Sequence, residues 1–202
     1  AAIASRLGIY QIKSDLEDLC FEYLYPEDYK EFADLLAGYR ERSEDYMEFA
    51  TSQVEQLLVR EGVKGATVQG RMKHLWSIYQ KFQKKDVRDL DEIYDLFAVR
   101  VILPDAYKDE KEDFSHLYSV LGLLHGEYLP MQERFKDYIA VPKTNGYRSL
   151  HTTVLGLGGD LYDEPTEVQI RTLGMHREAE IGIASHWTYK QAKKAKQRGN
   201  AK

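Results

Sequence analysis

The spacing of apolar residues changes part-way along this 202-residue chain, and the change sets what it can fold into. From residue 14 to about residue 61, apolar side chains recur three or four positions apart, which predicts two or three amphipathic helices. The run Pro26-Glu27-Asp28 is typical of a helix start, and Gly62 and Gly65 are typical of the end of the last helix. We assign no chemistry to this segment from its sequence.

The rest of the chain alternates helical patterns with short β-rich runs, which predicts a mixed sheet flanked by helices, an α+β fold. The clearest strand is the run 97–103, which ends at Pro104. Further strands are predicted near 138–141, 149–155 and 167–171. Helices are predicted at about 71–84, from residue 90, at 114–125 and at 176–190.

The amino-acid composition limits the kinds of protein that this chain can be. An apolar content of 43% is enough to build one sizeable core. The single cysteine, Cys20, leaves no disulfide framework and favours a reducing compartment, so we expect a cytoplasmic protein. No stretch approaches the roughly 20 apolar residues of a membrane span, so we expect no membrane partner.

The charge is distributed unevenly. The net charge of −5 argues against a general nucleic-acid binder. Residues 15–61 contain fourteen acidic and only four basic side chains, so positive charge is concentrated in the later part of the chain. An anionic ligand could bind there.

A basic cluster lies on the helix predicted at 71–84. Lys73, Ser77 and Lys81 are four residues apart, so such a helix places them on one face. With Arg71 in the first turn, the cations and the free backbone N–H groups suit a polyphosphate. The alternative is an ordinary amphipathic helix with a solvated basic face, and the spacing alone favours this alternative.

Acidic residues follow this cluster. Asp89-Leu90-Asp91 resembles the paired carboxylates of metal-dependent nucleotide transfer, but Asp89 with Glu92 also fits a helix capping box, which we prefer. Asp95 differs because the helical pattern gives way there to the strand-like run. A carboxylate at the end of a sheet is well placed to hold a metal.

The segment 143–151 is predicted to form a turn at Asn145-Gly146 that leads into a strand. If the strand begins at once, alternation puts Tyr147, Ser149 and His151 on one face. A flat aromatic ring beside hydrogen-bonding groups suits a nucleobase. A half-buried sheet face with the tyrosine in the core is an equal alternative.

Alternation is clean in the run 166–171. Its apolar residues face one way, and Glu167, Gln169 and Arg171 face the other. One interpretation is a solvated edge strand. The other is a site in which Glu167 and Asp95, from separate strands, hold Mg²⁺ against phosphate oxygens.

Several motifs are missing from the sequence. It contains no Gly-x-x-x-x-Gly-Lys-Ser/Thr loop, and the glycine-rich segment 156–159 is predicted to be a hairpin turn rather than a phosphate cradle. None of the six histidines is followed by aspartate, which excludes a metal phosphohydrolase site of the His-Asp type. His176 and Glu180, four residues apart, are more typical of a surface contact than of a metal site.

Taken together, these motifs resemble the synthetase domain of the RelA/SpoT family, whose members make guanosine tetra- and pentaphosphate. The resemblance covers about residues 63–190. It rests on seven blocks in order: Gly70-Arg71-Met72-Lys73-His74 with Ser77-Ile78-Tyr79, Asp95-Leu96-Phe97-Ala98-Val99-Arg100, Arg134-Phe135-Lys136-Asp137-Tyr138-Ile139-Ala140, Asn145-Gly146-Tyr147, Ser149-Leu150-His151-Thr152-Thr153, Glu167-Val168-Gln169-Ile170-Arg171-Thr172 and His186-Trp187.

The resemblance implies a nucleotidyltransferase-like α+β fold with an N-terminal helical segment. It divides the chain into a helical segment at 1–62, similar to the end of a hydrolase domain, a synthetase domain at 63–190 and a basic tail or linker at 191–202. Both ends resemble cuts through a larger protein. The basic form of the block 134–137 accompanies family members that both make and degrade the product, so we expect a bifunctional parent.

The resemblance also implies three groups of site residues. The ATP-binding group is Arg71, Lys73, Ser77, Lys81 and Arg100. The group that binds guanosine di- or triphosphate is Lys136, Lys143, Asn145, Tyr147, His151 and Gln169. The catalytic, Mg²⁺-binding pair is Asp95 and Glu167. Among these residues, Arg71 and Arg100 would stack on adenine and Tyr147 on guanine.

The activity implied is that of a GTP diphosphokinase (ATP:GTP 3′-diphosphotransferase) of the stringent response. Such an enzyme transfers the β,γ-pyrophosphate of ATP to the 3′-hydroxyl of GDP or GTP, giving ppGpp or pppGpp and AMP. In-line attack on the β-phosphorus is expected, with Glu167 a candidate acceptor of the hydroxyl proton.

Two alternative functions and the expected macromolecular partners complete the expectations. The first alternative is a catalytically silent regulatory module that binds guanosine nucleotides, and the second is an RNA-binding module that uses the tail 190–202, which we interpret instead as a solvated linker. The expected partners are a preceding hydrolase domain and, through C-terminal domains outside this sequence, the ribosome and tRNA.

Overall fold

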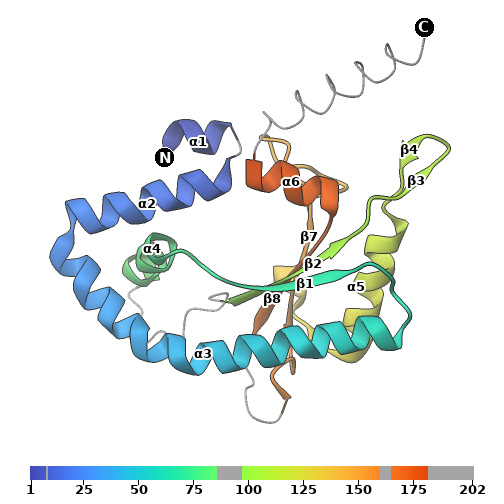
Figure 1. Ribbon diagram of the computed structural model, residues 1–202, viewed down its shortest axis with the longest axis horizontal. Coiled ribbons are helices and arrows are strands. Elements are labelled where there is room, and N and C mark those ends of the chain that lie inside the picture. Colours follow the sequence, from blue (N-terminus) through green and yellow to red (C-terminus); the bar gives the residue numbers. More distant parts are fainter. Residues whose placement is uncertain (8, 86–96, 160–164, 182–202) are drawn as a thin grey trace, which may run out of the picture.

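A computed structural model describes residues 1–7, 9–85, 97–159 and 165–181. It shows a six-stranded mixed sheet with helices on both faces and a separate two-stranded sheet (Figure 1). The helices are α1 (Ala2–Arg6), α2 (Tyr10–Leu24), α3 (Pro26–Arg60), α4 (Leu75–Lys85), α5 (Ser115–Glu127), the short 3₁₀ helix η2 (Gln132–Arg134) and α6 (Leu173–Ile181). The strands are β1 (Thr67–Met72), β2 (Phe97–Leu103), β3 (Tyr107–Lys108), β4 (Lys111–Glu112), β5 (Leu129–Pro130), β6 (Lys136–Asp137), β7 (Leu150–Leu155) and β8 (Thr166–Thr172).

The six-stranded sheet has the order β1-β2-β8-β7-β5, and β6 also pairs with β7. Strands β2 and β8 are parallel, whereas β1 with β2, β7 with β8, and β5 and β6 with β7 are antiparallel. The predicted α+β class with a mixed sheet is therefore confirmed. Strand β8 lies in the middle, so the interpretation of 166–171 as a solvated edge strand is wrong.

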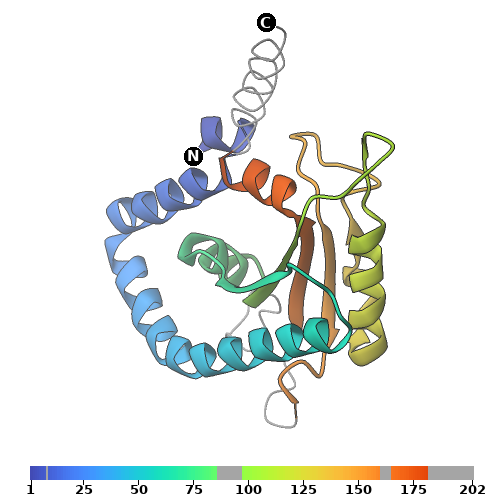
Figure 2. The same ribbon diagram turned by 45° about the vertical axis from the view of Figure 1, so that its right-hand side comes forward.

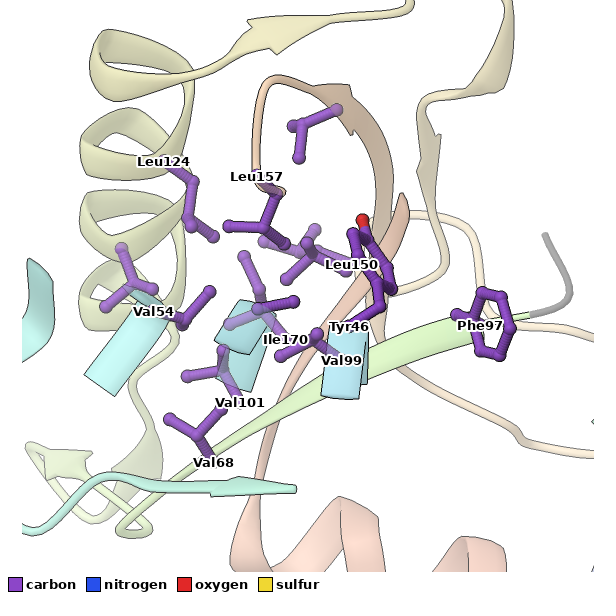
Figure 3. Close-up of a cluster of buried hydrophobic side chains, with 14 of the residues drawn as sticks. Tyr46, Val54, Val68, Phe97, Val99, Val101, Leu124, Leu150, Leu157 and Ile170 are labelled. Carbon is purple, nitrogen blue, oxygen red and sulfur yellow. The ribbon is translucent and has the colours of Figure 1, made fainter. Parts of the chain in front are cut away.

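One face of the sheet is apolar and forms the core with α3 and α5. Val99 pairs with Val168, and Val101 pairs with Ile170; all four side chains are 0% exposed. Figure 3 shows Val99, Val101 and Ile170 in one cluster with Val54 of α3 and Leu124 of α5. Burial of one face leaves the alternate side chains of the same strands pointing to the opposite face.

The helices α2 and α3 form a continuous arc around α4 (Figures 1 and 2). An aromatic cluster joins the three helices around Phe21, which is 1% exposed. Its ring centroid lies 4.4 Å from that of Tyr79 and 5.1 Å from that of Trp76, both on α4, and 5.5 Å from that of Tyr29 on α3. This packing keeps α2 against the polar side of the sheet.

Several predicted boundaries are confirmed. Helix α3 starts with Pro26 at its first turn, followed by two acidic residues, and it ends at Arg60, shortly before Gly62 with φ +70°. The strand 97–103 is confirmed to the residue. The turn Gly156 to Gly159 follows β7, as predicted, with a backbone hydrogen bond between its two ends.

The expected helix start at Arg71 is wrong, because Arg71 lies in β1 opposite Ala98. Gly70 does not begin a helix; it lets β1 pass close under α3, since a Cβ at this position would lie 2.7 Å from Cε of Met47. Helix α4 begins only at Leu75, so Lys73 lies in the connection before it. Arg71 therefore does not bind an anion through a helix N-terminus.

The expected strand at 138–141 is also wrong. Strand β6 ends at Asp137, whose Oδ1 accepts hydrogen bonds from the backbone N–H groups of Ile139 and Ala140 and turns the chain. The helix expected from residue 90 and the part of the last helix beyond residue 181 lie outside the described residues. Among the described residues, no helix is both long and apolar enough to cross a bilayer.

Candidate active site

A cavity of about 450 Å³ lies over the polar face of the sheet. Helices α2, α4 and α6 lie on this side of the sheet (Figure 2). Two rows of paired residues cross its floor. The first row contains Lys136, His151, Gln169 and Arg100, on β6, β7, β8 and β2 in turn. The second row contains Glu167 of β8 and Arg71 of β1, which both pair with Ala98 of β2 from opposite sides. Strand pairing thus brings together side chains that are far apart in the sequence.

The cavity is strongly basic although the chain as a whole is acidic. Its lining residues are Tyr10, Gln11, Ser14, Arg71, Lys73, Ser77, Arg100, Lys136, Tyr138, Lys143, Tyr147, His151, Glu167, Gln169, Arg171, Ala179 and Glu180. Six of them carry a positive charge and two carry a negative charge. This excess of cations in a concave site attracts a polyanion.

Glu167 is the carboxylate on the floor of this cavity, and its side chain is 17% exposed. Its Oε1 lies 2.8 Å from Nδ1 of His151, and its Oε2 accepts a hydrogen bond of 3.0 Å from Nε2 of Gln169. Burial raises the pKa of Glu167, but His151, the charge of Lys73 and the bond from Gln169 outweigh it and hold the pKa at about 2. Glu167 is therefore an anion at neutral pH and a weak base.

Aromatic rings surround Tyr147 at one end of the cavity. Its hydroxyl lies 2.8 Å from Nε2 of His151, and the rings of Tyr10 and Tyr138 approach edge to face at centroid distances of 5.9 and 6.0 Å. The ammonium group of Lys143 lies 5.0 Å from the centroid of the Tyr147 ring. Burial raises the pKa of Tyr147, so its hydroxyl stays protonated and can act as a donor.

At the other end, a buried arginine, Arg171, and a partly buried one, Arg100, meet a single carboxylate. Nη1 of Arg100 lies 3.1 Å from Oε1 of Glu180, and Nη2 of Arg171 lies 3.5 Å from the same oxygen. Burial, together with the charges of Arg171 and Arg71, lowers the pKa of Arg100 to about 10. Among the described residues, the buried Nε atoms of Arg100 and Arg171 have no hydrogen-bond partner.

A family model described as a region found in RelA / SpoT proteins matches residues 70–194, more than half of the chain. This chain belongs to the RelA/SpoT family. It is 48% identical over 191 residues to a GTP pyrophosphokinase of Streptomyces coelicolor, covering 95% of this chain and 21% of that protein. It is 46% identical over 193 residues to the bifunctional (p)ppGpp synthase/hydrolase RelA of Mycobacterium tuberculosis, covering 96% of this chain and 24% of that protein.

This RelA/SpoT chain thus spans about a quarter or less of the length of the curated relatives it matches. Solved structures share its fold. Small alarmone synthetase 1 from Bacillus subtilis, bound to its product pppGpp, gives a TM-score of 0.52 at 24% identity over 80% of this chain and 83% of that chain. Small alarmone synthetase 2 from the same organism gives 0.50 at 26% identity over 83% of both chains.

Ten of the residues predicted from the RelA/SpoT resemblance line one cavity: Arg71, Lys73, Ser77, Arg100, Lys136, Lys143, Tyr147, His151, Glu167 and Gln169. Lys81 does not line it, because it lies one turn beyond Ser77 along α4. Asn145 does not line the cavity either. Its Nδ2 donates a hydrogen bond to the hydroxyl of Tyr10, which does line the cavity. Asp95 lies outside the described residues.

Seven lining residues were not among those predicted: Tyr10, Gln11, Ser14, Tyr138, Arg171, Ala179 and Glu180. Alternation in β8 already placed Arg171 on the same face as Glu167, so the sequence indicated that Arg171 could belong to the site. The i, i+4 spacing of His176 and Glu180 was interpreted as a surface contact, whereas Glu180 pairs with Arg100 and Arg171 inside the site. The three residues of α2 had no signal, because helical periodicity does not show which helix covers which sheet face.

The low pKa of Glu167 makes folding stability depend on pH. The pKa is about 2 in the folded chain and 4.5 without these contacts, so the stabilisation is complete above pH 4.5 and is lost as pH falls toward 2. Between pH 5 and pH 3 the free energy of unfolding should therefore fall by roughly 2 kcal/mol more in the wild type than in Glu167→Gln. Urea titrations of both proteins at the two pH values measure this difference, and equal slopes with pH would contradict it.

Proposed function

We propose that this chain transfers the β,γ-pyrophosphate of ATP to the 3′-hydroxyl of GDP or GTP, giving AMP and ppGpp or pppGpp. The observation that carries the proposal is the single cavity that joins six cations, one ionised carboxylate at its floor and a tyrosine platform. Two polyphosphate nucleotides and an aromatic base need this combination. Relatives at 44–48% identity are named GTP pyrophosphokinases, which supports the same assignment.

The two ends of the cavity suit the two substrates. Arg71, Lys73 and Arg100 lie at the end formed by β1, β2 and the start of α4, where we place ATP. Lys136 and Lys143 lie beside Tyr147, where we place the guanosine substrate. Burial and the charge of Lys136 lower the pKa of Lys143. Both lysines line the cavity, where we propose that they bind the phosphates of the guanosine substrate.

In the proposed reaction, the guanosine 3′-oxygen forms a bond to the β-phosphorus of ATP, and the bond from that phosphorus to the α,β-bridging oxygen breaks. AMP leaves with that oxygen, and the hydroxyl proton passes to water. Positioning and charge neutralisation supply most of the rate in such a transfer. With a pKa of about 2, Glu167 contributes as an anion rather than as a strong base.

One of the two magnesium ligands that we propose, Glu167, lies among the described residues. Mg²⁺ is usually held by one or two carboxylates together with substrate phosphates. Glu167 is ionised and lies on the cavity floor, and the described residues contain no group of three possible ligands. Asp95, outside the described residues, is the second ligand that we propose. When bound, Mg²⁺ would neutralise charge on the phosphate oxygens of ATP.

The role of Tyr147 can be tested on one substrate at a time. Replacing Tyr147 by alanine should raise KM for GDP by about tenfold, because base–aromatic stacking contributes 1–3 kcal/mol. Tyr147→Phe keeps the ring and loses only the hydroxyl contact with His151, so its effect should be smaller. Initial rates with each substrate varied in turn measure both constants. An equal rise in KM for ATP would contradict the assignment of Tyr147 to guanine.

The proposed function is tested by incubating the chain with Mg²⁺, ATP and either GDP or GTP and separating the products by anion-exchange chromatography. Equal amounts of AMP and a 3′-pyrophosphorylated guanosine nucleotide, lost in Asp95→Ala, are expected. Binding of guanosine nucleotides without release of AMP would instead favour the regulatory-module alternative.

A further inference from the structure

One of the residues that hold Arg71 in place, Asp18, lies outside residues 70–194, the part of the chain that the family model matches. Asp18 lies on α2, and its Oδ1 accepts a hydrogen bond of 2.9 Å from the backbone N–H of Trp76, 58 residues away, at the start of α4. Its Oδ2 lies 3.6 Å from Nδ1 of His74. One carboxylate thus caps α4 and faces the imidazole that precedes it.

His74 extends this contact to the cavity. Its Nε2 lies 2.7 Å from Nη2 of Arg71, which lines the cavity. A guanidinium group has donors but no acceptor, so Nε2 must accept this hydrogen bond with its lone pair. The imidazole proton is then on Nδ1 and points to Asp18. The order of donors is fixed along the whole chain of contacts, from Arg71 to His74 to Asp18.

The surroundings favour this arrangement. Burial raises the pKa of Asp18, but its contacts with His74 and with the backbone N–H groups of Trp76 and Leu75 outweigh burial and lower the pKa. The side chains of Asp18 and His74 are 32% and 18% exposed, so the contact is partly shielded from water. Phe21, one turn after Asp18, packs against Trp76 and fixes the spacing between the two helices.

We infer that Asp18 and His74 are positioning residues that orient the guanidinium group of Arg71 for ATP. Neither side chain lines the cavity, so both act through Arg71. The same contacts fix the connection between β1 and α4, which carries Lys73 into the cavity. The inference rests on the proposed function, in which Arg71 contacts ATP.

Asp18→Asn tests the order of donors with little change of shape. The asparagine oxygen can still accept from Trp76 and cap α4, but its NH₂ group then faces Nδ1 of His74. Nδ1 must become the acceptor, which moves the imidazole proton to Nε2, against the donors of Arg71. KM for ATP should rise about tenfold, as for other partners that orient a binding group, with kcat within about twofold and KM for GDP unchanged.

His74 offers a matched pair of variants. His74→Gln can present an amide oxygen to Arg71 and an amide NH₂ to Asp18, so it should keep most of the ATP affinity, whereas His74→Leu should lose about tenfold. Glu22→Gln is the control for Asp18→Asn, because it removes an exposed carboxylate from α2, the helix that carries Asp18. Calorimetry with ATP alone measures affinity without turnover, and ¹⁵N shifts of the His74 ring report which nitrogen carries the proton.

The outcomes separate the two proposals. If the wild type releases no AMP, the proposed function fails, while calorimetry and the ¹⁵N shifts still test the role of Asp18 and His74. If Asp18→Asn binds ATP as the wild type does, or if the ring proton stays on Nδ1 in that variant, the inference is wrong. Equal ATP affinity in His74→Gln and His74→Leu would overturn it as well.

Discussion

Replacing Glu167 by glutamine is expected to lower the rate of AMP formation by about two to three orders of magnitude, the range seen when one charge-stabilising group is removed from an active site. Glutamine has nearly the same shape and keeps one oxygen that can accept from His151 or Gln169. It removes the negative charge that a pKa of about 2 maintains on the cavity floor at neutral pH. The loss should appear in kcat rather than in KM, because the Glu167 carboxylate would hold the Mg²⁺ that neutralises charge on the transferring group.

Initial-rate measurements of AMP release with saturating ATP and GDP give kcat for this variant. Circular dichroism and urea unfolding at pH 7 would establish that the fold is retained. Glu133→Gln is the control, since Glu133 lies on η2 and does not line the cavity. Turnover near that of the wild type in Glu167→Gln would remove Glu167 from the catalytic group.

The sequence predicted the parts of the fold that depend on local periodicity. The start of α3 at Pro26 follows from helix-start chemistry, and the strand 97–103 follows from an apolar run that only Arg100 interrupts. Strand β1 escaped prediction because Gly70 resembles a helix boundary, although its less polar residues alternate with polar ones along TVQGRM. Its place in the sheet is decided by pairing with β2 and by close packing under α3, which are tertiary contacts.

The candidate site likewise combines residues that local patterns predict with residues that only tertiary contacts bring together. Alternation alone placed Glu167, Gln169 and Arg171 on one face, and the family resemblance added residues from other strands. The register then explains why they meet, since Gln169 pairs with His151 on one side and with Arg100 on the other. The contribution of α2 depends on how that helix crosses the sheet. Its sequence shows one apolar stripe but not which surface the polar side chains meet.

Phe21→Ala should lower the free energy of unfolding by about 3–5 kcal/mol, the usual cost of removing a fully buried aromatic ring. Phe21 is 1% exposed, and its ring contacts Tyr29, Trp76 and Tyr79, so the cavity left behind cannot be filled by solvent-facing side chains. Tyr23→Ala is the matched control on the same helix, because Tyr23 is 86% exposed. Urea unfolding followed by circular dichroism compares the two.

The same variant tests whether α2 acts on the site through its packing. Helix α2 carries Tyr10, whose hydroxyl accepts from Asn145, and Asp18, which contacts His74. Under conditions where Phe21→Ala is still folded, KM should rise for both ATP and GDP, because the two contacts lie at opposite ends of the cavity. Asp18→Asn should raise KM for ATP alone. A stability loss below about 1 kcal/mol in Phe21→Ala would contradict the buried aromatic cluster, and with it the path from α2 to the nucleotide site.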